Sequence, residues 1–349
     1  MRRVLERPRV GVSYPGSLPE VRGWFGSDAD CVDYLDWLRW PEGWSCPSCG
    51  SSLEQAAPLG QRRCGRCRRR SSVTAGTIFH KTRTPLTVWF EAAWLFTASK
   101  QGLSATELQA VTGLGGYQTA WAMLHRFRIA MSSTGREALT GRVEVDETFI
   151  GGADQPGGFG RSGIGKALVA AAVERRGPHA LGRVRLQAIE NGTLDSIRPF
   201  LADAIAPGAT VISDAFPTYR PATGSLRLAH EPINIAASGQ KADELLPGVH
   251  RVFSLLKRVL GSTYQGAVSP QHLQAYLDEF AFRFNRRTAT QRGLLFLRLL
   301  EHAVTAPPTT YHDLVIDPTP TGRTSPRVAP RPQPRSLAGP NAHRPWRAA

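Results

Sequence analysis

Four of the five cysteines form two closely spaced pairs near the start of the chain. The pairs are Cys46 with Cys49 and Cys64 with Cys67, and 14 residues separate them. Two thiolates three positions apart across a tight turn can supply two of the four tetrahedral ligands that Zn²⁺ takes. The spacing therefore predicts a structural Cys₄ zinc site without an open position for substrate. A redox-active pair and four unrelated buried thiols are the alternatives, and Cys31 is predicted to be a core residue.

Arginines surround the second cysteine pair. Six of the nine positions from 62 to 70 are Arg and none is acidic. Guanidinium groups on a rigid ribbon are well suited to contact phosphates. We therefore predict DNA contacts from Arg66, Arg68 and Arg69, with a solvated charged face as the alternative.

Two aspartates lie where carboxylates could support metal-dependent chemistry. Asp146 is in VEVDETFI (143–150), whose alternation places the valines on one face and Glu144 with Asp146 on the other. Asp214 ends an apolar run in ATVISDAF (209–216) and so lies at the carboxyl end of a strand. Such strand ends form the ligand-binding edge of α/β sheets. Two carboxylates there could bridge two Mg²⁺ ions that activate water for phosphodiester chemistry, and capping or turn roles are the alternative.

A helix after the second aspartate is expected to supply a third ligand. The candidate is His250 in PGVHRVFSLLK (247–257). His250 and Lys257 are seven positions apart, two helical turns, so they share one face of that helix.

Short apolar segments after residue 140 predict the elements that position these residues. Strands are expected at 143–150, 167–174, 184–190 and 209–216, a helix at 193–205, and further helices from 243 to 303. Three strands, a helix, a strand and further helices predict a mixed α/β sheet.

Residues 104–131 have the pattern of a helix-turn-helix. Ser104 and Glu107 form a capping-box pattern, and glycines interrupt the helix before Tyr117. This motif places its second helix in the major groove of DNA. We expect Trp121, Leu124 and Ile129 to face the core, His125 to face outward, and Gln118, Arg126 and Arg128 to contact DNA.

The charge of the chain favours a nucleic-acid partner. There are 43 Lys and Arg against 28 Asp and Glu, a formal net charge of +15. An excess of this size predicts a polyanionic partner. No run of 18 apolar residues is present and the basic start lacks the apolar core of a signal peptide, so neither a membrane span nor secretion is expected. The glycine-rich segment 157–166 lacks P-loop spacing, so no nucleotide cofactor is expected, and a flexible basic loop is the interpretation.

Together these segments resemble the bacterial insertion-sequence transposases of the DDE superfamily that carry an N-terminal zinc ribbon. The resemblance covers about residues 30–300 and is most specific in VEVDETFIGG (143–152) and HLQAYLDEFAFRFNRR (272–287). It implies an RNase H-like catalytic domain in which Asp146 and Asp214 bind Mg²⁺ or Mn²⁺. The third ligand position varies among relatives, with Glu, Asn or His.

Here the third position falls on His250, 36 residues after Asp214, and Glu244 is the alternative. An imidazole is a softer ligand than a carboxylate, and Mg²⁺ prefers oxygen. Metal ligation, positioning of water and a weakened copy of the enzyme therefore stay open for His250. Lys257 matches the basic residue that the family has seven positions later, which implies a DNA-backbone contact near the scissile phosphate.

The resemblance implies a transposase that cleaves the terminal inverted repeats of its element and joins the freed 3′-hydroxyl to target DNA. It also implies a homo-oligomer acting in the cytoplasm, at the bacterial nucleoid. The alternatives are a DNA-binding regulator, an RNase H-like nuclease without strand transfer, and an inactive copy.

The predicted fold class is therefore α/β with several domains. We expect a flexible lead-in at 1–30, a zinc ribbon at 31–80, a helical, helix-turn-helix-like DNA-binding domain at 81–135, the RNase H-like mixed-sheet catalytic domain at 140–305, and a disordered Arg/Pro-rich tail at 306–349.

Overall fold

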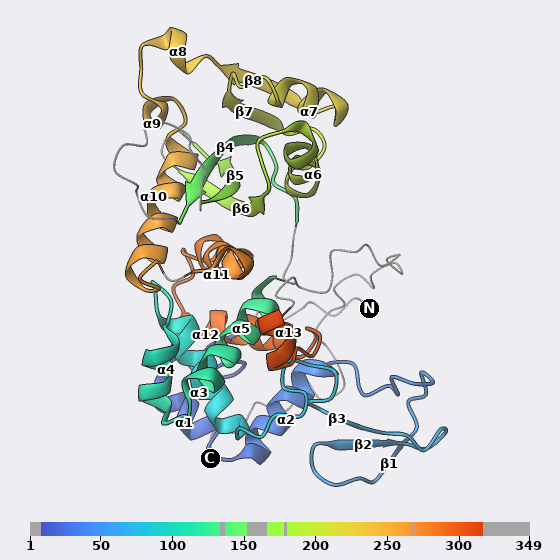
Figure 1. Ribbon diagram of the computed structural model, residues 1–349. Helices are drawn as coiled ribbons and strands as arrows, with labels where there is room; N and C mark the ends of the chain where they lie inside the picture. The colour runs from blue at the N-terminus through green and yellow to red at the C-terminus, as the bar shows by residue number, and fades with distance from the viewer. Residues whose placement is uncertain (1–7, 133–136, 152–165, 178–179, 267, 317–349) are drawn as a thin grey trace. The chain divides into compact units, whose positions relative to one another are not determined.

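A computed structural model describes residues 8–132, 137–151, 166–177, 180–266 and 268–316 (Figure 1). These residues form two compact units, one within Met1–Ser133 and Ala289–Ala349 and the other within Thr134–Thr288. The predicted basic loop at 157–165 and the tail from 317 onward lie outside the described residues. None of the helices in the described ranges has the length and apolar character needed to cross a membrane.

The first unit combines a small antiparallel sheet with a group of helices. The sheet has the order β1-β2-β3. Its strands are β1 (Glu54–Gln55), β2 (Gln61–Cys64) and β3 (Arg70–Ser72), and the helices are α1 (Leu18–Trp24), α2 (Asp28–Arg39), α3 (Leu86–Ala98), α4 (Ala105–Thr112), α5 (Tyr117–Ser132), α12 (Arg292–Ala303) and α13 (Tyr311–Ile316).

Helix α12 packs into the core of this first unit. The ring of Phe296 lies 6.0 Å from the Phe90 ring and 5.9 Å from the Trp94 ring, centroid to centroid. The prediction that the catalytic domain extends to 305 therefore differs from the structure, in which the compact second unit ends at Thr288. Packing the apolar face of α12 against the aromatic residues of α3 removes apolar surface from water, and this burial stabilises the helix in the first unit.

The start of the chain is more ordered than predicted. Ser17 caps α1 by accepting a hydrogen bond from the Glu20 N–H. Val21 and Trp24 are buried, so part of the predicted flexible lead-in belongs to the core. At the other end, residues 311–316 of the predicted disordered tail form α13.

The second unit is built on a five-stranded mixed sheet with the order β6-β5-β4-β7-β8. Strands β4, β5 and β6 are antiparallel neighbours, whereas β4, β7 and β8 run parallel. The strands are β4 (Arg142–Ile150), β5 (Ala167–Arg175), β6 (Leu181–Ile189), β7 (Thr210–Asp214) and β8 (Ala229–Ile233). The mixed sheet confirms the predicted fold class, and β8 is the strand that the sequence pattern missed.

Helices cover both faces of this sheet. Alternate residues of β5 divide between two cores, with Val169, Ala171 and Val173 in the core that includes α10 and α11. Ala170 and Ala172 belong to the opposite core, which includes α6 and α7. The helices of this unit are α6 (Leu194–Ala204), α7 (Tyr219–Ser225), α8 (Ile235–Ser238), α9 (Ala242–Leu245), α10 (Pro247–Ser262), the 3₁₀ turn η1 (Pro270–His272) and α11 (Leu273–Asn285).

Candidate active site

Asp146 and Asp214 occupy equivalent positions on neighbouring parallel strands. The register of β4 and β7 pairs Glu144 with Ile212, and each aspartate lies two residues further along its strand. Adjacent strands lie about 4.8 Å apart, so the two carboxylates start from neighbouring backbone positions. Val143 and Val145 pack in the α6/α7 core, and alternation therefore directs Asp146 to the α10 side of the sheet.

Both aspartates accept backbone hydrogen bonds that restrict their side chains. Asp146 Oδ1 accepts from the N–H of Glu147 at 2.8 Å. Asp214 Oδ1 accepts from the N–H of Phe216 at 3.2 Å. The Asp146 side chain is 18% exposed, so it is largely packed but still reached by solvent.

Glu147 and Tyr219 form a pair on the opposite, α6/α7 face of the sheet, next to the strand position of Asp146. The Tyr219 hydroxyl donates to Glu147 Oε1 at 2.6 Å. Burial, then the charge of Glu147 and its hydrogen bond, and then the charges of Asp146 and Asp214 raise the pKa of Tyr219 well above 10. The phenol therefore stays protonated and is a hydrogen-bond donor close to three carboxylates. The signal in the sequence is weak: a tyrosine five residues after Asp214.

His250 lies next to Asp146. Its Nε2 atom is 3.5 Å from Asp146 Oδ2. The same Nε2 atom is buried, and within the described residues it has no hydrogen-bond partner. A buried polar atom without a hydrogen bond costs free energy. This nitrogen is therefore suited to coordinate a metal ion that would complete the site.

The other two candidates on this side of the unit are exposed. Lys257 lies two turns after His250 on α10, with its side chain open to solvent. Glu244, the alternative third ligand, is exposed in α9, whereas His250 is the side chain whose Nε2 lies 3.5 Å from Asp146 Oδ2.

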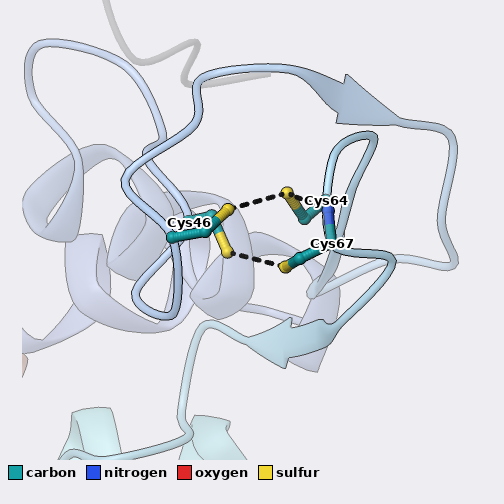
Figure 2. Close-up of side chains that lie close together, drawn as sticks. Cys46, Cys64 and Cys67 are labelled. Carbon is teal, nitrogen blue, oxygen red and sulfur yellow. Dashed lines mark hydrogen bonds between the residues drawn. The ribbon is translucent and has the colours of Figure 1, made fainter.

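The four paired cysteines converge in the first unit, and Figure 2 labels Cys46, Cys64 and Cys67 among them. Cys46 Sγ lies 3.6 Å from Cys67 Sγ, and Cys49 Sγ lies 3.6 Å from Cys64 Sγ. All four sulfur atoms lie within 4.8 Å of one another. Zn–S bonds of about 2.3 Å in a tetrahedron put sulfur atoms about 3.8 Å apart, so the four thiolates fit Zn²⁺.

The environments of these sulfurs differ, because at Cys67 a backbone hydrogen bond at Arg69 is outweighed by burial and by hydrogen bonds with the neighbouring thiols, which raise the pKa to about 11. The backbone N–H of Cys67 contributes most to lowering the pKa of Cys64 to about 6. Trp44 is buried against the cluster and Trp40 packs beside it, which shields the sulfurs from water. Among the residues that the structure describes, this is the one group of three or more Cys, His, Asp or Glu whose ligand atoms all lie that close together.

Two family matches cover separate segments of the chain, and each segment contains one of the two sites. Residues 138–285 match the ISXO2-like transposase domain, which includes Asp146, Asp214 and His250. Residues 26–70 match the transposase zinc-ribbon domain, which includes all four paired cysteines. The chain belongs to the insertion-sequence transposases of the DDE superfamily.

Two individual proteins are similar to this transposase. It is 28% identical over 281 residues to an uncharacterized protein in transposable element ISH50 of Halobacterium salinarum, with 74% of the transposase and 91% of that relative covered. A chain in the cryo-EM structure of the simian T-cell lymphotropic virus intasome in complex with PP2A regulatory subunit B56 gamma is 17% identical, with a TM-score of 0.31. The similarity covers 70% of the transposase and 76% of that chain. Only the sequence matches assign the family.

The zinc ribbon of the transposase presents several arginines to solvent. Arg66, Arg68 and Arg69 are exposed, and Arg69 donates to Ser48 Oγ at 3.3 Å. Arg62 differs because its guanidinium forms ion pairs with two carboxylates of the same unit, those of Asp36 and Glu54. The ribbon thus presents the guanidinium groups of these three arginines to solvent, whereas Arg62 stabilises the ribbon's own structure.

The second helix of the predicted helix-turn-helix is oriented differently from the prediction. Gln118 is exposed at the start of α5, as expected. Arg128 is only 1% exposed, with its guanidinium 5.7 Å from the centre of the Phe96 ring, so the prediction that it faces DNA is wrong. Arg126 is half-buried and donates to the Thr309 carbonyl at 2.7 Å.

His125 and Ile129 show that the buried side of α5 differs from the predicted one. His125 is buried although it was expected outside, and Ile129 is only partly buried although it was expected in the core. Helix α5 contacts α3, α4, α12 and α13, so it is covered on several sides. One apolar stripe therefore does not define its buried surface.

Proposed function

We propose that this transposase cuts the ends of its element and joins them to target DNA by metal-dependent phosphoryl transfer on the second unit. The observation that carries the proposal is the equivalent register of Asp146 and Asp214, with His250 Nε2 3.5 Å from Asp146. The sheet order β6-β5-β4-β7-β8, with three antiparallel strands followed by two parallel ones, supports an RNase H-like catalytic domain.

The donor atoms fit divalent ions. Carboxylate oxygens are the preferred protein ligands of Mg²⁺, and Asp146 and Asp214 supply them from adjacent strands. The unpartnered Nε2 of His250 is a third donor, better suited to Mn²⁺ than to Mg²⁺. When bound, such ions neutralise phosphate charge and lower the pKa of water.

The chain's own groups would position the DNA. Lys257 is exposed on the same face of α10 as His250, where its ammonium would contact a backbone phosphate. The protonated Tyr219 hydroxyl holds Glu147 by a hydrogen bond and so stiffens the strand beside Asp146. Because phosphoryl transfer depends chiefly on positioning and charge neutralisation, these contacts would contribute to the rate.

The first unit would recognise the element's ends. Arg66, Arg68 and Arg69 are available for phosphates on the zinc ribbon, and Gln118 at the start of α5 is available for a base edge. Joining two ends to one target requires both ends in a single complex, so we propose that the transposase acts as a homo-oligomer on DNA.

A cleavage and joining assay tests the proposal. Full-length protein is incubated with labelled DNA from either side of its gene in Mg²⁺ or Mn²⁺, and nicked and joined products are separated. Asp146→Asn and Asp214→Asn remove one charge each without changing side-chain size. Asp203→Asn, an exposed position near the carboxyl end of α6, is the matched control.

We expect nicked and joined products from wild type and Asp203→Asn, and a loss of at least about 1,000-fold in both site variants. His250→Ala then distinguishes a ligand from a bystander, since loss of a nitrogen ligand should weaken activity more in Mn²⁺, which binds imidazole more readily, than in Mg²⁺. Cleavage without joining would support a nuclease. Equal activity in wild type and Asp214→Asn would overturn the proposal.

A further inference from the structure

Glu144 is a buried carboxylate that connects two elements of the candidate active site. Its side chain is 1% exposed. It accepts a hydrogen bond from Arg175 on the neighbouring strand β5 and another, at 2.8 Å to Oε2, from the backbone N–H of Val249 in α10. Burying a carboxylate is costly unless it is paired and hydrogen-bonded, and Glu144 has both kinds of contact.

The start of α10 depends on this contact. The residue before the helix is Leu246, which has no side-chain acceptor, and Pro247 occupies the first helical position. Val249 is at the third position, where an N-cap side chain usually accepts the free N–H. Glu144 takes that place from another strand, and its negative charge is favourable at the positive end of the helix dipole.

Gly248 allows the helix to approach this closely. A Cβ atom at Gly248 would lie 2.7 Å from Glu144 Oε2 and 3.0 Å from Leu181 Cδ2. A larger residue would therefore displace the Glu144 carboxylate or the first turn of α10 and so disturb the contact between them.

Glu144 and Asp146 lie on the same face of β4, two residues apart, and His250 directly follows Val249. We propose that Glu144 is a positioning residue that holds the first turn of α10 so that His250 stays at Asp146. The consequence for the reaction rests on the proposed function, whereas the consequence for the helix start does not. Glu144 itself is not next to the reacting phosphate in this proposal.

Hydrogen exchange of the full-length protein tests the structural half. The variants are Glu144→Ala, Glu144→Gln, whose amide oxygen can still accept from Val249, and Gly248→Ala. The control is Glu279→Ala, which removes another buried carboxylate, one bonded to Arg283 and to the hydroxyl of Tyr264 just beyond the end of α10.

We expect Glu144→Ala and Gly248→Ala to reduce protection of the peptide covering 247–250 by about tenfold. Glu144→Gln should restore most of that protection, and Glu279→Ala should leave it unchanged. Equal protection in wild type and Glu144→Ala overturns the proposal. If Glu144→Ala does not fold, Glu144→Gln and Gly248→Ala decide by the same measurement.

Cleavage kinetics test whether the position of α10 matters for the reaction. We expect Glu144→Ala to lower kcat by about 100-fold with little change in the KM for DNA, because the reacting groups are displaced while DNA contacts remain. Glu144→Gln should recover part of the rate. A loss of protection at 247–250 with unchanged kcat would overturn the positioning role. If wild type cuts no DNA, the proposed function fails while the exchange result still decides the helix contact.

Discussion

The Tyr219 hydroxyl donates a hydrogen bond to Glu147 at 2.6 Å, beside the strand position that carries Asp146. The phenol is buried and lies close enough to Asp146 and Asp214 for their charges to raise its pKa. This neutral donor holds the Glu147 carboxylate without adding a positive charge beside the aspartates.

Tyr219→Phe should remove this donor and lower the free energy of unfolding by about 1–3 kcal/mol. The effect should also depend on pH. Because the folded-state pKa is raised, the stabilisation from Tyr219 is complete below about pH 10 and is lost as pH rises through the folded-state pKa. Urea unfolding at pH 8 and above pH 10 measures it.

The difference in unfolding free energy between wild type and Tyr219→Phe reports on Tyr219 alone. Tyr34 also has a raised pKa, but it is present in both proteins and its contribution cancels. A wild-type stability that falls above pH 10 by the same amount as that of the variant would contradict this assignment.

Glu174→Gln should reduce stability at neutral pH and weaken its dependence on acid. Burial opposes ionisation of Glu174, but hydrogen bonds from Arg183 and from the backbone N–H groups of Arg183 and Thr140 outweigh it and lower the pKa to about 2. A lowered pKa gives a stabilisation that is present above pH 4.5 and is lost as pH falls through about 2. The gap between the unfolding free energies of wild type and variant should therefore shrink over that range.

Zinc content should depend on the paired cysteines. Inductively coupled plasma mass spectrometry of purified protein should find one zinc ion per chain in wild type. Cys49→Ser should lose the metal because a hydroxyl is a poor replacement for a thiolate. Cys31→Ala should retain it, since Cys31 is buried in α2 and is not one of the four clustered sulfurs. Zinc retained by Cys49→Ser would mean that the ligands are different.

The exposed arginines of the ribbon should determine the salt dependence of DNA binding. Removing one phosphate contact lowers the slope of log K against log salt by about 0.9. Arg66→Ala and Arg69→Ala should each show this change in a fluorescence anisotropy titration. Arg62→Ala removes the same charge from a residue paired with Asp36 and Glu54, so its slope should stay near that of wild type.

Much of the sheet could be predicted because its strands carry strong local patterns. In VEVDETFI the alternation placed the valines in the α6/α7 core and Asp146 on the other face, as the structure has them. The closing strand β8 has no such pattern, since Ala229–Ile233 contains a histidine, a glutamate and a proline at a sheet edge. Its pairing with β7 depends on tertiary contacts that a local pattern does not contain.

The roles of buried polar residues could not be predicted for the same reason. Arginine is a residue type that often contacts DNA, yet Arg128 is buried against the Phe96 ring because α5 is covered on several sides. The contact of Glu144 with Val249 joins positions 105 residues apart in the sequence. Neither spacing nor residue type connects them until the sheet and α10 are assembled.

The return of α12 to the first unit makes the aromatic core of that unit depend on residues that follow the whole second unit in the sequence. During synthesis the whole second unit must be made before Phe296 can complete the aromatic cluster around Phe90 and Trp94. A product terminated before residue 289 lacks this helix, which packs on α2, α3 and α5 in the complete chain. In such a product the rings of Phe90 and Trp94 lack the packing partner that Phe296 supplies in the full chain.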